Sequence, residues 1–208
     1  MIQKLQLFAL YILLSTPCFS QEKLVLQSGD LIFQNLQCGP MCDAINEVTT
    51  GYKNLKFNHI GLVVLKEDQA FVIEAGGQSV KSTPLQQFLS YSSQTMYLGR
   101  VKEAYTSLIP EAIAFATEQI GLPYDDDFLY DNGKYYCSEL IYDAFKYAYK
   151  KPFFKLYPMT YKPLGSADYF PVWVSYFEAL GQPIPEGLPG CNPGGISTSD
   201  KINILGAL

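Results

Sequence analysis

The chain has 208 residues, of which 48% are hydrophobic and 17% are charged. This composition is typical of a globular protein and excludes extensive disorder, and the length is sufficient for one domain with a substantial core. The net charge of −5 provides no basic surface for a phosphate backbone, so we expect no nucleic-acid partner.

The N-terminal residues 1–20 have the pattern of a secretory signal peptide. Lys4 precedes an apolar run from Leu5 to Leu14, which is too short to span a bilayer comfortably, and small or polar residues follow up to Ser20. We expect cleavage after Ser20 and export to the periplasm or cell envelope, with no transmembrane segment left. Residues 21–208 would then form a single domain.

Lipid attachment at Cys18 is the competing interpretation, although the preceding proline makes a poor lipoprotein site. Cleavage would leave four cysteines, enough for two disulfides. They are Cys38, Cys42, Cys137 and Cys191. If Cys137 is a working thiol, then either Cys38 pairs locally with Cys42 or another cysteine stays free. A metal site at Cys38 and Cys42 lacks partners, because the remaining cysteines and the single histidine are far away in sequence.

The first predicted elements are two strands, in KLVLQ and LIFQ, separated by a turn at residues 28–30. A short helix is expected to start near Asp43, with Ile45 and Val48 facing inward, and to end at Gly51.

The segments FNHIGLVVL and AFVIEA predict an antiparallel hairpin. If its turn centres on residues 67 and 68, opposed residue numbers sum to about 135. This register brings His59 or Ile60 opposite Glu74 or Ala75. A carboxylate at that position can accept a hydrogen bond from an imidazole nitrogen and orient the ring. His59 is the only histidine, and its place opposite a carboxylate in an apolar hairpin favours a functional interpretation over a solvated strand end.

A further strand is expected in residues 78–84, a helix from Leu85 and a strand over residues 96–101. Pro110 and Gly121 delimit a clear helix. Its predicted inward face consists of Ala112, Ile113, Ala116 and Ile120.

Residues 122–136 form an acidic and aromatic loop with three consecutive aspartates, Asp125 to Asp127. Such a run suggests calcium, but the glycine and terminal glutamate of an EF-hand loop are absent. We therefore interpret the segment as a loop that borders a groove, and we expect no metal or other cofactor.

Cys137 opens the apolar periodic run LIYDAFKYAY, which predicts a helix ending at Lys151-Pro152. Free backbone N–H groups and the positive end of the helix dipole favour an anion at this position, so a thiolate is stabilised there. Residues 168–180 are expected to form a strand or short helix. From about residue 181 a Pro- and Gly-rich arm is expected to lie over the domain.

A cysteine nucleophile needs a base to take its proton and a third group to orient that base. The candidates are Cys137, His59 and Glu74, which occur in the order His, Glu, Cys. Papain-like enzymes usually have the cysteine first.

The reversed order resembles the circularly permuted branch of the NlpC-type papain-like superfamily. Six segments share this resemblance: SGDLIFQ, NHIGLVV, FVIEA, IGLPYD, YYCSEL and the GCNPGG arm. The closest group is the YiiX-like cysteine hydrolases, which are related to lecithin retinol acyltransferase. The resemblance covers roughly residues 28–195. It implies an α+β fold in which an antiparallel sheet packs against helices and the nucleophile lies at a helix N-terminus.

The resemblance also implies hydrolysis of an amide or ester through an acyl-enzyme, with His59 as base and Glu74 as its orienting group. Tyr124, Tyr136 and Asp30 are candidates for supporting groups. The substrate would be a cell-envelope peptide or a lipid or acyl compound, and the sequence does not predict the oligomeric state. Three alternatives stay open: an acyltransferase, a lipid- or peptide-binding module without turnover, and a structural protein in which Cys137 is disulfide-bonded.

Overall fold

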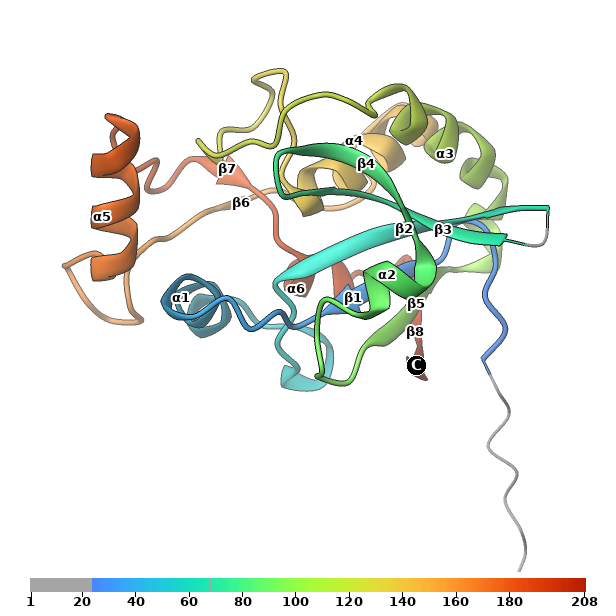
Figure 1. The fold of residues 1–208 in the computed structure, drawn as a ribbon, viewed down its shortest axis with the longest axis horizontal. Coiled ribbons are helices and arrows are strands. Elements are labelled where there is room, and N and C mark those ends of the chain that lie inside the picture. The colour runs from blue at the N-terminus through green and yellow to red at the C-terminus, as the bar shows by residue number, and fades with distance from the viewer. Residues whose placement is uncertain (1–23, 68) are drawn as a thin grey trace, which may run out of the picture.

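The computed structural model describes residues 24–67 and 69–208, so the predicted signal peptide lies outside the described residues. Six strands form one antiparallel sheet in the order β4-β3-β2-β1-β5-β8 (Figure 1). The strands are β1 (Leu31–Gln34), β2 (His59–Lys66), β3 (Gln69–Gly76), β4 (Ser79–Pro84), β5 (Tyr97–Val101) and β8 (Ile202–Ala207).

The helices lie on both faces of this sheet and at one end of the molecule (Figure 1). They are α1 (Pro40–Val48), α2 (Leu85–Leu89), α3 (Ile109–Glu118), α4 (Cys137–Tyr149), α5 (Pro171–Leu180) and α6 (Pro193–Ser197). Two 3₁₀ helices (Tyr52–Asn54 and Glu103–Leu108) and a small ribbon of β6 (Tyr157–Pro158) and β7 (Pro189–Gly190) complete the structure.

Strand alternation divides the core between the two faces, because successive side chains of a strand point to opposite sides. Leu31 and Phe33 join the larger core under α4, whereas Ile32 between them joins a second core with Phe88 of α2. Each fully buried leucine, isoleucine or phenylalanine contributes about 1.5–3 kcal/mol relative to an exposed one. Helix α4 is therefore held firmly between the sheet and α3.

The predicted hairpin is confirmed in its register. Leu62 pairs with Ile73 and Lys66 with Gln69, so opposed residue numbers sum to 135 as expected. The helix that begins at Cys137 is also confirmed. Its predicted apolar face, Leu140, Ile141, Ala144, Phe145 and Ala148, is buried.

Several predictions about individual elements were wrong. Residues 24–27, in the KLVLQ segment, do not form a strand. The first helix starts at Pro40 rather than Asp43 and ends at Val48 rather than Gly51. Ile120 lies beyond the end of α3 and is 42% exposed, because that helix stops at Glu118.

The C-terminal part of the chain is more regular than predicted. The segment 168–180 contains helix α5, and the arm after residue 181 contains β7, α6 and the edge strand β8. Helix α5 packs against α1 through a core that includes Ala44, Trp173 and Phe177. Within residues 24–67 and 69–208, no helix has both the length and the hydrophobicity needed to cross a bilayer.

Candidate active site

Cys137 is the first residue of α4 and is preceded by Tyr136 in an extended conformation. The thiol is 7% exposed, and its sulfur lies 3.8 Å from the backbone oxygen of Asn58, next to the start of β2. The first N–H groups of a helix have no intrahelical acceptor, so they favour a negative charge at this position. The Cys137 sulfur therefore lies where the N-terminus of α4 approaches the start of β2.

His59 and Glu74 form a buried pair on the adjacent strands β2 and β3. The imidazole Nε2 lies 2.6 Å from Glu74 Oε2, and the Glu74 side chain is 1% exposed. The other carboxylate oxygen accepts hydrogen bonds from the Thr83 hydroxyl (2.6 Å) and the Tyr91 hydroxyl (3.2 Å), with Lys81 Nζ at 3.9 Å. The carboxylate is thus held from several sides.

The pair is ionised at neutral pH. Burial by itself lowers the pKa of His59, but hydrogen bonding to Cys137 and Glu74 and the electrostatic influence of these two side chains outweigh burial and raise the pKa from 6.5 to about 9. Burial raises the pKa of Glu74, but the hydrogen bond and charge of His59 dominate, so the Glu74 pKa is lowered. An imidazolium between a carboxylate and a thiol is therefore the favoured state.

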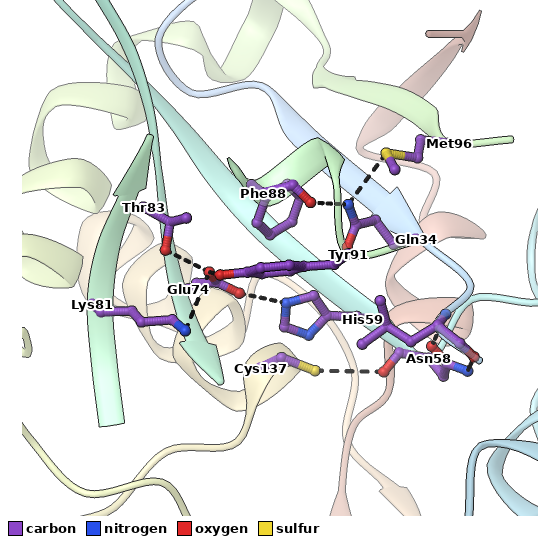
Figure 2. Close-up of polar contacts among 11 residues, drawn as sticks. Gln34, Asn58, His59, Glu74, Lys81, Thr83, Phe88, Tyr91, Met96 and Cys137 are labelled. Carbon is purple, nitrogen blue, oxygen red and sulfur yellow. Dashed lines mark hydrogen bonds and ion pairs between the residues drawn. The ribbon is translucent and has the colours of Figure 1, made fainter. Parts of the chain in front are cut away.

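The structure brings the three predicted residues together. Figure 2 shows Cys137 and Glu74 approaching the imidazole of His59 from different elements. Because Nε2 bonds Glu74, the nitrogen left for Cys137 is Nδ1.

Sequence reasoning missed the groups that hold Glu74. Lys81 pairs with Glu74 across β3 and β4, and Thr83 lies two residues further along β4. The glycines at the end of β3 were a usable signal, since a turn at Gly77-Gln78 gives opposed residue numbers that sum to 155. Tyr91 follows α2, and no local pattern pointed to it.

The three candidate supporting groups have different roles. Tyr124 lines the cavity beside Cys137. The hydroxyl of Tyr136 accepts a hydrogen bond from the Cys191 N–H (3.1 Å) and therefore holds the C-terminal arm. Asp30 is not part of the site, because it is buried in an ion pair with Arg100 (2.6 Å).

The four cysteines within residues 24–67 and 69–208 form one disulfide and leave two thiols. Cys38 is bonded to Cys42, while Cys137 and Cys191 are free. The structural alternative with a disulfide-bonded Cys137 therefore does not hold. Cys191 is also tied to the helix start, since Ser138 Oγ donates to its carbonyl oxygen (3.0 Å). The arm is thus anchored by both sequence neighbours of Cys137.

A cavity of about 450 Å³ opens beside Cys137, between α1, the start of α4 and the β6 region. Ile45 and Val48, which were predicted to face inward, line it, and Ile45 also packs against the core of Ala44, Trp173 and Phe177. The rest of the wall combines aromatic side chains and Met159 with neutral polar Thr, Ser and Asn side chains; the aromatic part includes Phe128, Tyr161 and Trp173. Among the described residues that line it, none is Asp, Glu, Lys, Arg or His.

All three consecutive aspartates make structural contacts within the protein. Asp125 is fully buried and accepts hydrogen bonds from the Leu129 N–H (2.7 Å) and the Asn132 amide (2.9 Å). Asp127 pairs with Lys134. In the described part of the chain, no group of three or more His, Cys, Asp or Glu side chains is arranged to hold a metal ion.

Three comparisons with known proteins point to the same family of permuted papain-like proteins. A family model described as "Permuted papain-like amidase enzyme, YaeF/YiiX, C92 family" matches residues 25–205. The uncharacterized protein YiiX of Escherichia coli (strain K12) is 30% identical over 147 residues, which cover 70% of this chain and 68% of that protein. The fold is similar to the crystal structure of metalloprotein yiiX from Escherichia coli O157:H7, with a TM-score of 0.71 and 24% identity over 88% of this chain and 97% of that chain.

Proposed function

Because this chain belongs to the YaeF/YiiX family of permuted papain-like amidases, we propose that it is an exported thiol hydrolase that cleaves an amide bond through a Cys137 acyl-enzyme. His59 is the base in this proposal and Glu74 orients it. The observation that carries the proposal is the 2.6 Å contact between His59 Nε2 and Glu74 Oε2, with Cys137 at a helix start beside the same ring.

In the first step the Cys137 sulfur attacks the carbonyl carbon, and the tetrahedral oxyanion forms. Imidazolium Nδ1 of His59 then donates its proton to the leaving nitrogen, and the amine departs. In the second step the same nitrogen takes a proton from water, which attacks the thioester and releases the acid. Glu74 keeps the ring oriented and stabilises its positive charge throughout.

The oxyanion requires donors that are in place before it forms. Backbone N–H groups of the first turn of α4 are the donors on one side of the oxyanion. We assign the second donor to the hydroxyl of Tyr124, which lines the cavity beside Cys137. Burial, with the adjacent Cys137 as the next cause, raises the pKa of Tyr124, so its hydroxyl keeps its proton. Its backbone is held between Gln78, whose carbonyl accepts the Tyr124 N–H, and Tyr135.

The cavity favours an uncharged acyl group. Its wall combines aromatic and aliphatic side chains with neutral Thr, Ser and Asn side chains and contains no cation, whereas a cell-wall peptide presents carboxylates that need cationic partners. We therefore place acyl amides ahead of cell-envelope peptides as substrates. The yiiX crystal structure is described as that of a metalloprotein, but the described residues of this chain hold no group of three or more His, Cys, Asp or Glu side chains that could bind a metal ion, so the proposed steps use none.

Export is supported by the N-terminal pattern and by the Cys38–Cys42 disulfide, since such bonds persist in oxidising compartments. N-terminal sequencing of the protein recovered from the periplasm should find Gln21 first. Recovery of the intact N-terminus from the cytoplasm would contradict export.

The function is tested by mapping the alkylation of Cys137 by iodoacetamide from pH 6 to pH 9, together with hydrolysis of N-acyl amides of increasing chain length. We expect rapid labelling at neutral pH that is lost in His59→Ala, and turnover that is lost in Cys137→Ser. Slow labelling that is indifferent to His59 would refute the catalytic assignment. Preferential transfer of the acyl group to an added amine instead of water would favour the acyltransferase alternative.

A further inference from the structure

Phe128 lies at the centre of the aromatic cavity wall in a conformation that is uncommon for its residue type. Its backbone φ is 52°, in the left-handed region that bulky side chains rarely adopt. Its ring packs against four others, Tyr124, Tyr136, Trp173 and Tyr176. Such a backbone persists only where the surrounding structure holds it.

Two buried carboxyl groups hold the loop that contains Phe128. Asp125 accepts the backbone N–H groups of both neighbours of Phe128, Asp127 (3.1 Å) and Leu129 (2.7 Å). Further along the loop, Oε1 of Glu139 accepts the backbone N–H of Asp131 (3.0 Å), which also has a positive φ of 65°. Glu139 lies in the first turn of α4, so this bond fastens loop 125–131 to the helix that carries Cys137.

Glu139 has no partner for a negative charge. The residue is 0% exposed, its second oxygen Oε2 has no hydrogen-bond partner, and it belongs to none of the ion pairs among the described residues. Burial raises its pKa to about 8, and the carboxylates of Asp125 and Asp143 add to this, while backbone N–H donors oppose it.

The other titratable groups around Glu139 do not offset its charge. The nearest cation on its own helix, Lys146, is engaged by Asp143 and by the Tyr130 hydroxyl. The groups that face Glu139 from the loop, from α4 and from the arm are all acids, phenols or a thiol: Asp125, Asp131, Tyr135, Tyr136, Asp143 and Cys191.

We propose that Glu139, as a neutral carboxylic acid, is a positioning residue that fastens loop 125–131 to the nucleophile helix and so keeps Phe128 in the cavity wall. This inference rests on the proposed function only in taking that cavity as the substrate site. A neutral acid at position 139 accepts a hydrogen bond from the Asp131 N–H. It places no negative charge in the helical turn that begins with Cys137. Loss of its proton creates an uncompensated buried anion beside Asp125, and the loop must open for water to reach it.

Trp173 reports on this loop without any need for activity. It is the only tryptophan of the chain, and its ring lies 5.5 Å from that of Phe128, centroid to centroid. We would follow its fluorescence in the full protein from pH 6.5 to pH 9.5. The parent should show a transition with a midpoint near 8, the value to which burial raises the Glu139 pKa.

Glu139→Gln keeps the acceptor for Asp131 but cannot ionise, so its spectrum should match the parent at pH 6.5 and stay constant to pH 9.5. Glu111→Gln changes a half-exposed glutamate on α3, whose side chain is 56% exposed, and should titrate like the parent. At pH 7 the Gln variant should retain kcat/KM within about twofold, whereas Glu139→Ala should lose about tenfold or more, because it leaves a buried N–H unpaired.

A parent spectrum that is constant across the range, or a Gln variant that still shows the transition, would overturn the proposal. If Glu139→Gln fails to fold, infrared difference spectroscopy of the parent decides instead. A protonated carboxylic acid that titrates near pH 8 in the parent and whose C=O band is shifted in Glu139→Asp supports the proposal, and its absence from the parent refutes it. An unreactive Cys137 combined with the expected Trp173 transition would refute the proposed function and leave this inference intact.

Discussion

His59 Nε2 lies 2.6 Å from Glu74 Oε2, and the two side chains are 8% and 1% exposed. The contact fixes which imidazole nitrogen faces Cys137, and it places a charged pair where solvent screens it little. Removing one member of such a pair leaves the other charge uncompensated.

Glu74→Gln should lower kcat/KM for amide hydrolysis by about 10²-fold or more, because the imidazolium loses both its orientation and its counter-charge. The pKa of His59 should fall from about 9. His59 is the only histidine, so NMR reports its titration without ambiguity. Glu118→Gln, at an exposed position on α3, should leave both quantities unchanged. An unchanged His59 pKa in Glu74→Gln would contradict this account of the pair.

The stability of the fold should depend on pH through His59. Its pKa is raised from 6.5 to about 9 on folding, so the folded state holds a proton that the unfolded chain releases above pH 6.5. This stabilisation is fully present below pH 6.5 and is lost as the pH rises to about 9. Denaturant unfolding of the parent and His59→Gln should show a difference in unfolding free energy that shrinks over this interval. A constant difference would argue against a charged His59.

Tyr124→Phe should lower kcat by about 10²- to 10³-fold if its hydroxyl binds the oxyanion, the range expected for loss of one such donor. Iodoacetamide labelling of Cys137 should be unchanged, because alkylation forms no oxyanion. Tyr147→Phe, at a residue that is 51% exposed, is the matched control. A parallel loss of labelling and turnover in Tyr124→Phe would mean that the ring only supports the local structure.

Gly61→Ala should destabilise the protein by about 1–3 kcal/mol, as overpacked cores do. A Cβ at Gly61 would lie 2.2 Å from Val72 Cγ1 and 3.0 Å from the Phe88 ring, which packs against His59. Denaturant unfolding measures the loss. Ser82→Ala, at an exposed position on β4, should stay within about 0.5 kcal/mol of the parent. Parent-like stability of Gly61→Ala would show that β2 can shift to make room.

The sequence alone was sufficient for features that depend on periodicity and short separations. The β2–β3 register followed from one turn, because alternation leaves little freedom once a buried hairpin turn is placed. Helix α4, with Cys137 at its start, followed from an apolar face that repeats at helical spacing. Periodicity gave wrong predictions for residues 24–27, which precede β1, and for Ile120, which follows α3. In both places apolar residues extend beyond the strand or helix.

Only the tertiary structure decided which distant groups meet. Asp30 pairs with Arg100 instead of joining the site, and Tyr91 reaches Glu74 from beyond α2. The arm residue Cys191 is held by Tyr136 and Ser138. Ile45 and Val48 line a cavity that exists only because α1 lies opposite the β6–β7 region. Each of these contacts joins segments far apart in the chain, and their pairing is decided by the packing of the whole core, which no local pattern encodes.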